Sequence, residues 1–263
     1  MRVEVLISAV NLDSIDFYKK LNLECDGLII NQAGYNAYEE VDTGDFKVRM
    51  ITSDTKGSAI SRNLAILNSN ADIIIMSDDD EVFESGYVKM VKDAFISNPK
   101  VDFFVFKTII HQDGKKIVKV SEEKNLNVLN CLRYGTVHFV FRREAIIKKN
   151  IFFHPYFGAG TENGGGEDSF FILEAIRKGL RLRTNTNLLA QVYNDDSTWF
   201  EGFTEKYFYN KGQLARALFN KTYRLYIEQF LLRHKEMLKL VDKNQARKLM
   251  LEGANDFGGK NGK

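Results

Sequence analysis

The stretch that decides the fold, residues 73–81, reads IIIMSDDDE. It joins an uninterrupted apolar run to four adjacent carboxylates. An apolar run without alternation predicts a strand buried on both faces, as in a parallel sheet covered by helices. Because ligands bind beyond the carboxyl ends of such strands, the acidic residues are predicted at the binding edge of the sheet.

Short apolar runs alternate with helical patterns around this stretch. Further strands are predicted at Val3–Ala9, Gly27–Asn31, Phe46–Thr52 and Val101–Ile110. A helix is expected after Asp13-Ser14, another with Ile60, Leu64 and Leu67 on its inner face, and a third that Ser85 caps and Val88, Val91 and Phe95 anchor. This order predicts a mainly parallel sheet with helices on both sides.

The second half of the chain changes character after Asp113-Gly114, a two-residue hairpin signal. The remaining expectations are a strand at Val137–Phe141, helices at Arg143–Lys149 and Glu167–Lys178, and strands at Arg181–Arg183 and Leu188–Tyr193. Five glycines between residues 154 and 166 predict a mobile loop. From Phe203 onward the pattern is helical and basic. We therefore expect an α/β domain over residues 1–200 and a helical extension over 201–263, packed on it.

The composition fits an ordinary soluble protein, because 44% of the 263 residues are hydrophobic and 27% are charged. The two cysteines form no CxxC pair, which is typical of a reducing compartment. No signal-peptide pattern opens the sequence, and no apolar run approaches the roughly 20 residues that cross a bilayer. A cytoplasmic location is predicted.

Charge is distributed unevenly along the chain. The net charge is +2, yet residues 203–250 contain eleven Lys and Arg against four Asp and Glu. The simpler interpretation of this segment is a solvated helix that covers the domain. The functional one is a helix that contacts the cytoplasmic face of an anionic membrane, near a lipid-linked acceptor. Nucleic acid is not expected as a partner, since no binding motif accompanies the charge.

Three local features could carry chemistry. The acidic run at 78–81 repels itself unless a cation is present, and Mg²⁺ or Mn²⁺ shares oxygen ligands with phosphates. Glu167 and Asp168 follow three glycines at a helix start, where they are either caps or a general base beside a closing loop. Residues 56–63 open another helix with Lys56 and Arg62, which favours anions there.

Together, and in this order, the motifs resemble bacterial family-two glycosyltransferases of the GT-A fold. The resemblance rests on SAVN at 8–11, GSAISRNLA at 57–65, IIIMSDDDE at 73–81 and GEDSFF at 166–171. It covers roughly residues 3 to 200 and implies a GT-A-like α/β/α sandwich. It also implies a sugar transferred from a nucleotide-diphosphate donor, a UDP-sugar by resemblance alone, to a hydroxyl of a saccharide or lipid-linked acceptor.

The resemblance also implies roles for individual residues. The nucleotide base would lie at Ser8, Ala9, Asn11 and Asn31, with Arg62 near the nucleotide. Asp78 would contact the ribose, Asp80 the Mn²⁺ or Mg²⁺ ion, and Asp79 could replace either; Asp78 is also counted with Asp80 for the metal. Asp168 would be the catalytic base, with Glu167 touching one of the sugars. Direct attack on the anomeric carbon would invert its configuration. The resemblance also implies a role in the synthesis of a surface polysaccharide or a glycoconjugate.

One departure concerns the metal. Many relatives place a histidine on the strand after the Glu-Asp helix, and this chain has none there. Tyr193, Asn194 or Asp195 could stand in for it. Trp199 could stack on a sugar, although a lone tryptophan is more often part of a core or an interface.

Other functions remain open at this point. A nucleotidyltransferase also uses paired carboxylates and a metal, but it would usually carry a glycine-rich basic loop after the first strand, where this chain reads SAVNLD. A receiver-like switch would be much shorter. A non-catalytic nucleotide-binding module of the same fold is the third alternative.

Overall fold

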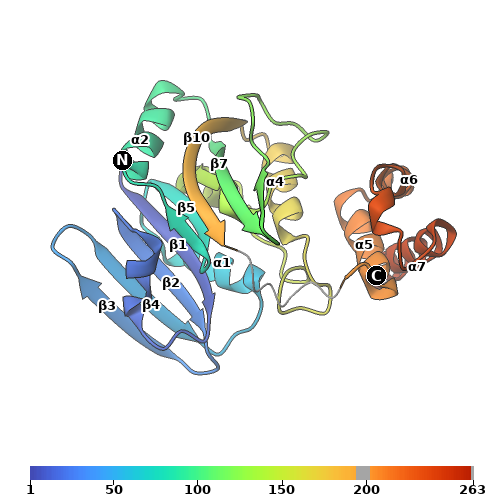
Figure 1. Cartoon of the computed structure of the whole chain (residues 1–263), viewed down its shortest axis with the longest axis horizontal. Coiled ribbons are helices and arrows are strands. Elements are labelled where there is room, and N and C mark those ends of the chain that lie inside the picture. The colour runs from blue at the N-terminus through green and yellow to red at the C-terminus, as the bar shows by residue number, and fades with distance from the viewer. Residues whose placement is uncertain (194–201, 262–263) are drawn as a thin grey trace. The chain divides into compact units, whose positions relative to one another are not determined.

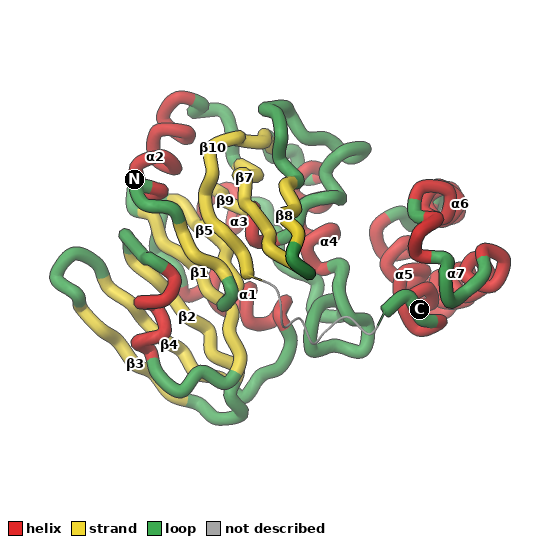
Figure 2. The backbone as a smooth tube through the Cα atoms, viewed as in Figure 1, coloured by secondary structure: helices red, strands yellow, loops and turns green. Residues whose placement is uncertain are grey.

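The computed structural model describes residues 1–193 and 202–261. It divides into two compact units. The first comprises Met1–Thr161 and Glu167–Asp196, and the second comprises Glu162–Gly166 and Ser197–Lys263. Each unit is described by itself (Figures 1 and 2). The expectation that the helical extension packs on the first domain stays a prediction.

The described residues of the first unit form a ten-stranded sheet in the order β3-β4-β2-β1-β5-β9-β7-β10-β6, with β8 paired to β7. The strands are β1 (Val3–Val10), β2 (Asp26–Gln32), β3 (Ala37–Asp42), β4 (Lys47–Ser53), β5 (Ile73–Asp78), β6 (Glu81–Phe83), β7 (Phe103–Gln112), β8 (Lys115–Val118), β9 (Phe139–Arg142) and β10 (Leu182–Tyr193). Strands β4, β2, β1 and β5 pair in parallel, as do β7 and β10.

Strand direction places the binding edge. Strand β9 runs antiparallel to both β5 and β7. Strands β5 and β7 therefore point the same way, and so does β10. The carboxyl ends of β1, β2, β5, β7 and β10 accordingly lie at one edge of the sheet, which is where ligands of open α/β sheets bind.

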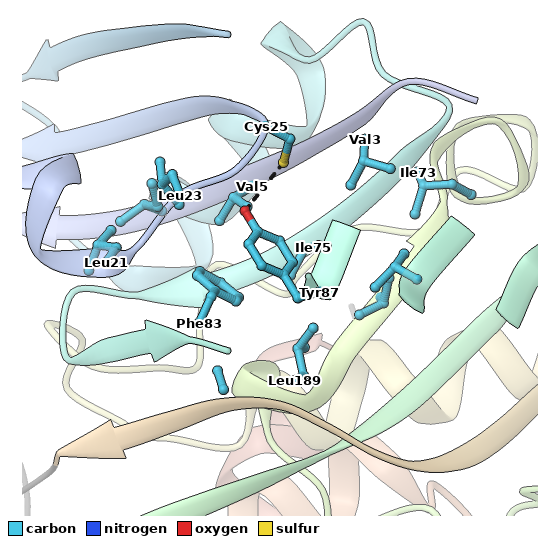
Figure 3. Close-up of a cluster of buried hydrophobic side chains, with 14 of the residues drawn as sticks. Val3, Val5, Leu21, Leu23, Cys25, Ile73, Ile75, Phe83, Tyr87 and Leu189 are labelled. Atoms are coloured by element: carbon cyan, nitrogen blue, oxygen red, sulfur yellow. Dashed lines mark hydrogen bonds between the residues drawn. The ribbon is translucent and has the colours of Figure 1, made fainter. Parts of the chain in front are cut away.

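One face of the sheet is apolar and sealed. It is covered by the 3₁₀ helix η1 (Ile15–Leu21) and by α2 (Tyr87–Ser97). Val5 and Ile75 from the strands meet Tyr87 in this layer, where the Tyr87 hydroxyl lies 3.4 Å from the Cys25 sulfur (Figure 3). Both cysteines are buried and free. Burial raises the pKa of the Cys25 thiol to about 12, so the thiol stays protonated.

The other face carries α1 (Ser58–Asn68) and α4 (Glu167–Arg177), and α3 (Arg143–Lys148) follows β9. Phe171 of α4 stacks with Phe153 at 4.1 Å and packs against Phe103, Phe139 and Phe141 of the strands. Helices thus cover both faces, and the predicted α/β/α sandwich is confirmed.

Several local expectations are confirmed and others are wrong. The hairpin holds Asp113 and Gly114 at φ 50° and 69°, as a two-residue turn of the primed type requires. The inner face of α1 is not Ile60, Leu64 and Leu67, because Leu67 is 57% exposed while Ala59, Ala65 and Ile66 are buried. The buried face of α1 combines Ala59, Ala65 and Ile66 with the polar residues Ser58, Ser61 and Arg62.

Three boundaries also differ from expectation. Gly86, not Ser85, is the N-cap residue of α2. The strand expected from Val137 begins at Phe139, after the 3₁₀ helix η2 (Thr136–His138). The two short strands around residues 181–193 are one strand, β10, whose irregularities after Asn185 and Leu188 interrupt the sequence pattern without ending the pairing.

The second unit is helical where it is described. Its helices are α5 (Glu205–Leu218), α6 (Tyr223–Arg233), η3 (Lys235–Met237) and α7 (Lys243–Asn261). Two glycines let α5 and α7 touch, since a Cβ on Gly212 would lie 2.0 Å from the Met250 oxygen and one on Gly253 would lie 2.1 Å from the Tyr209 oxygen. Among the described residues, no helix is long and apolar enough to cross a bilayer.

Candidate active site

The sheet brings the first two motifs together at its binding edge. Ser8 of β1 is the register partner of Asp78 of β5. The Ser8 hydroxyl lies 2.8 Å from the Ser61 hydroxyl of α1. Helix α1 therefore starts directly over the ends of these two strands, and Arg62 lies one position beyond Ser61.

Arg62 is the centre of the site. Its side chain is only 6% exposed, and Nη2 donates to Asp78 Oδ1 at 2.7 Å. Nη1 donates to Glu167 Oε1 at 2.8 Å and reaches Asp168 Oδ1 at 3.4 Å. Burial alone would lower the pKa of Arg62, but Asp78, Asp168 and Glu167 outweigh burial and raise it. One guanidinium thus joins Asp78 to Glu167 and Asp168, which are distant from it in the sequence.

The glycine loop allows Glu167 to reach α1. The Ser58 hydroxyl donates to Glu167 Oε1 at 2.9 Å, and the Ser58 N–H donates to the Ala159 carbonyl at 3.0 Å. A Cβ on Gly158, whose φ is 118°, would lie 2.6 Å from the Ser58 hydroxyl and 3.0 Å from the Glu167 carboxyl carbon. Glycine is therefore required at position 158 by both the backbone angle and the lack of space.

Asp168 has the properties of a general base. Its side chain is 29% exposed, and a hydrogen bond with the Thr136 backbone favours its charged form. Burial raises the pKa of Asp168 to about 7, Glu167 and Asp78 add to the rise, and Arg62 opposes it. A carboxylate with a pKa near neutrality can accept a proton during a reaction and lose it afterwards.

The four carboxylates of the acidic run are not equivalent. Asp78 is bonded to Arg62. Burial and the charge of Asp78 raise the pKa of Asp79, while the Val10 backbone N–H lowers it. Burial, Asp78 and Asp79 raise the pKa of Asp80 to about 7. Glu81 is fully buried on β6, and burial, with Asp78 next, raises its pKa well above the usual value.

The residues present fit a divalent cation held mainly by Asp80. Asp80 Oδ1 is buried and has no hydrogen-bonding partner in the described part of the chain, so it is a free acceptor beside further negative charge. No group of three or more His, Cys, Asp or Glu side chains that could hold a metal occurs among residues 1–193 and 202–261. Mg²⁺ needs no such group, because it commonly uses one or two carboxylates together with substrate phosphates.

The residues expected to hold the nucleotide base lie at the ends of β1 and β2. Ala9 is buried, and Asn11 is exposed in the left-handed region with φ 53°. Asn31 is fully buried, and its side-chain amide exchanges two hydrogen bonds with the Leu12 backbone, at 2.9 and 3.1 Å. Asn31 thereby fixes the loop after β1. Base contact by these residues and by Ser8 stays a prediction.

The structure adds residues that the sequence motifs did not single out for this role. Ser58 was part of a quoted motif, but its bond to Glu167 depends on the fold. Lys119 follows β8; burial lowers its pKa and the charge of Asp168 raises it, so the two groups lie within electrostatic reach. No sequence signal marked Lys119. Asn194, Asp195 and Trp199, named as a metal stand-in or a sugar contact, lie outside the described residues.

Comparisons with known proteins agree with the motif-based resemblance. Residues 34–159 match the sequence model of the family described as Glycosyl transferase family 2. The matched range contains Arg62 and the acidic run, and it ends before Glu167 and Asp168. The resemblance drawn from the motifs is confirmed. No curated protein matches this chain in sequence.

Solved structures confirm the GT-A-like fold class. TarS of S. aureus superposes with a TM-score of 0.66 at 14% identity, over 98% of this chain and 48% of TarS. A TarS segment, residues 1–349, in complex with UDP-GlcNAc gives 0.65 at 15% identity, over 98% of this chain and 80% of the segment. This chain therefore spans about half the length of the whole TarS chain.

Proposed function

We propose that this chain, which matches glycosyl transferase family 2 over residues 34–159, transfers a sugar from a nucleotide-diphosphate sugar to a hydroxyl acceptor. The observation that carries the proposal is the Arg62 cluster. It joins Asp78, on the donor side of the site, to Glu167 and Asp168, on the side of the base. A nucleotidyltransferase or a passive module would not need a base with a pKa near neutrality beside the acidic run.

A UDP-sugar is the proposed donor. The support comes from the similar structures: the TarS segment is in complex with UDP-GlcNAc, and another TarS structure, with a TM-score of 0.57, is in complex with UDP. In this chain the ends of β1 and β2 and the acidic run lie at one edge of the sheet, the edge at which ligands of open α/β sheets bind. A panel of nucleotide sugars identifies which sugar is transferred.

The proposed reaction is a single displacement. Asp168 takes the proton of an acceptor hydroxyl, the hydroxyl oxygen bonds to the anomeric carbon, and the bond from that carbon to the diphosphate oxygen breaks. UDP leaves with the bonding electrons, and the anomeric configuration inverts. Glu167 is engaged by Ser58 and Arg62, so its part is to hold the cluster and the start of α4 in place.

A divalent ion at Asp80, with Asp78 nearby, would neutralise the diphosphate as it departs. At this position the protein contributes Asp80 Oδ1, a buried oxygen that accepts no hydrogen bond from the described residues. Arg62 is committed to carboxylates, which leaves the charge of the diphosphate to the ion. Mn²⁺ or Mg²⁺ is the proposed cofactor.

An acceptor held at an anionic membrane is proposed from the second unit. Leu225, Leu232 and Leu240 are exposed, and their neighbours in the sequence include exposed basic residues, which are Lys221, Arg224, Arg233, Lys235 and Lys239. Apolar side chains flanked by cations favour the surface of an anionic bilayer. Surface polysaccharide or glycoconjugate synthesis at the cytoplasmic face is the corresponding proposed role. Co-sedimentation with phosphatidylglycerol vesicles, lost in Leu225→Ser/Leu232→Ser, tests it.

The central experiment is a panel of nucleotide sugars with Mn²⁺ and Mg²⁺, scored by nucleotide release and by thermal shift. UDP-sugars are expected to bind with metal and to hydrolyse slowly. Asp168→Asn should keep binding and lose roughly 10²–10⁴-fold in transfer, the usual contribution of a general base. Asp80→Ala should weaken metal-dependent binding instead.

Matched controls separate these effects from misfolding. Asp93→Asn changes an exposed carboxylate of α2 that pairs with Lys89, and it should leave binding and transfer unchanged. The glycosyltransferase proposal fails if no nucleotide sugar binds in the presence of metal. Retained anomeric configuration in the product, measured by NMR, would disprove the single displacement.

A further inference from the structure

An aromatic pair lies at the binding edge, outside the cluster just described. The rings of His111, near the end of β7, and Tyr193, at the end of β10, stack with centroids 4.8 Å apart and planes at 8°. Tyr193 remains 49% exposed. Because His111 covers one face of the tyrosine ring, the exposed area lies on the opposite face and the ring edge. We call these two residues the aromatic platform.

A chain of hydrogen bonds holds the aromatic platform in place. Gln191 Nε2 donates to the Glu84 carboxylate at 2.9 Å, so its amide oxygen faces His111. That oxygen lies 2.9 Å from His111 Nε2, which must therefore carry the proton. Tyr193 is fixed from its backbone, since its N–H donates to the Asp80 carbonyl at 2.9 Å. Such ordering of a half-exposed ring indicates a preformed binding surface rather than a freely rotating side chain.

The aromatic platform and the Arg62 cluster lie on the same face of the sheet. Along β7, His111 has the same parity as Phe103, which packs against Phe171 of α4. Tyr193 is the register partner of His111. Asp78 lies on the α1 side, as its bond to Arg62 shows. A ligand on the aromatic platform therefore lies on the face of the Arg62 cluster and not on the apolar face that α2 covers.

The position of the aromatic platform within the sheet favours the acceptor over the donor. The proposed nucleotide residues end β1 and β2, on one side of β5 and its acidic run. Strands β7 and β10 lie on the other side of β5, beyond β9. Asp168 also lies toward that second side, because it bonds the backbone of η2, the segment that leads into β9. The base and the platform thus share the side that the donor leaves open.

We propose that the ring of Tyr193, supported by His111, stacks against a pyranose ring of the acceptor saccharide. The C–H face of a pyranose is flat and apolar, and it matches an exposed aromatic face in shape and polarity. The hydroxyls at its rim would remain in water or face Asp168. The assignment of the saccharide as the acceptor rests on the proposed function. The binding of a saccharide to Tyr193 does not.

Saturation-transfer NMR on the full chain tests the aromatic platform with three probes: methyl β-glucopyranoside, methyl β-galactopyranoside and methyl N-acetyl-β-glucosaminide. At least one probe should bind with its axial C–H protons closest to the protein. Tyr193→Ala should weaken that binding roughly tenfold, about the value of one aromatic contact. Tyr193→Phe should restore it, and Tyr38→Ala, which removes an exposed tyrosine of β3, should not change it.

Binding of UDP with Mn²⁺, measured by calorimetry on the same variants, separates the alternatives. It should be equal in wild type, Tyr193→Ala and Tyr193→Phe. The inference is overturned if no probe binds, or if Tyr193→Ala binds as wild type does. Weaker UDP binding in Tyr193→Ala would assign the ring to the nucleobase, and weaker Mn²⁺-dependent binding in Tyr193→Phe would assign the hydroxyl to the metal. Absent UDP binding in the wild type would instead defeat the proposed function and leave the saccharide result standing.

Discussion

The two faces of the same sheet are built on opposite principles. On the face under α2, Val5, Ile75 and Phe104 belong to one cluster of buried apolar residues, in which the Tyr87 hydroxyl lies beside the Cys25 sulfur. On the face under α1, the same strands present polar residues to the helix: Ser8 of β1 bonds Ser61, and Asp78 of β5 bonds the buried Arg62. Stability should therefore depend on volume on the first face and on charge balance on the second.

Replacing Arg62 tests the charged face most severely. Arg62→Met should cost about 3–5 kcal/mol of unfolding free energy, because Glu167 is left buried without its cation. The loss should be smaller at pH 5 than at pH 8, because Asp168, whose pKa burial raises to about 7, is protonated at the lower pH. Urea unfolding at both pH values measures this. Lys89→Met, in an exposed pair with Asp93, is the control and should change little. A loss as small as in the control would mean that the cluster is not stabilising.

Removing a core ring tests the apolar face. Phe104 is buried and meets Phe95 edge-on at 4.9 Å. Phe104→Ala should cost about 3–5 kcal/mol through lost burial and a cavity. In contrast to Arg62→Met, the loss should not depend on pH between 5 and 8. Nucleotide binding by the folded fraction should stay the same, and a change in affinity would show that the two faces are not independent.

The pH dependence of Asp168 links activity and stability in opposite directions. Its pKa rises from 3.8 to about 7 on folding, so folding favours the protonated form. The stability that Asp168 contributes is complete below about pH 3.8 and is lost as pH rises through 7. As a base, Asp168 works only when deprotonated, so kcat/KM should rise about tenfold per unit up to pH 7 and then level off.

Asp168→Asn separates the pH dependence caused by Asp168 from that caused by the other carboxylates. Urea titration at pH 5 and pH 8 gives the unfolding free energies of the variant and of the wild type. The variant should be more stable relative to the wild type at pH 8 than at pH 5. A rate profile that is flat from pH 5 to pH 8 would argue against Asp168 as the base. Arg62, Glu167 and Asp78 are the charged groups that set its pKa.

The smallest effect is expected from the Tyr87 hydroxyl, a polar group on the apolar face. The Tyr87 hydroxyl accepts the Glu24 N–H at 3.2 Å and lies beside Cys25, and burial raises its pKa. Tyr87→Phe should cost about 1 kcal/mol, the usual net value of a hydrogen bond. Thermal unfolding measures it, with Tyr38→Phe on the exposed strand β3 as the neutral comparison. A loss near that of Phe104→Ala would mean that this pair organises the face.

Much of the fold was predictable because its signals are local. The apolar runs of β1, β2 and β5 and the alternating pattern of β4 were predicted correctly, because their lengths are those of strands. The exposed edge strand β3 and the short β6 were missed, because neither has a buried face long enough to give a pattern. The inner face of α1 was wrong because the apolar residue Leu67 is exposed and the buried residues include Ser58, Ser61 and Arg62.

The sequence by itself determined the acidic run after a buried strand, the Glu-Asp pair after the glycines, and the order that resembles family-two glycosyltransferases. Those features follow from neighbouring residues and from motif order. Only the tertiary structure decided that Arg62 bonds Asp78 and Glu167 at once, that Asp168 has a pKa near 7, and that His111 stacks on Tyr193. Each of these depends on strand register, on helix placement and on burial, which arise from contacts between residues distant in the sequence.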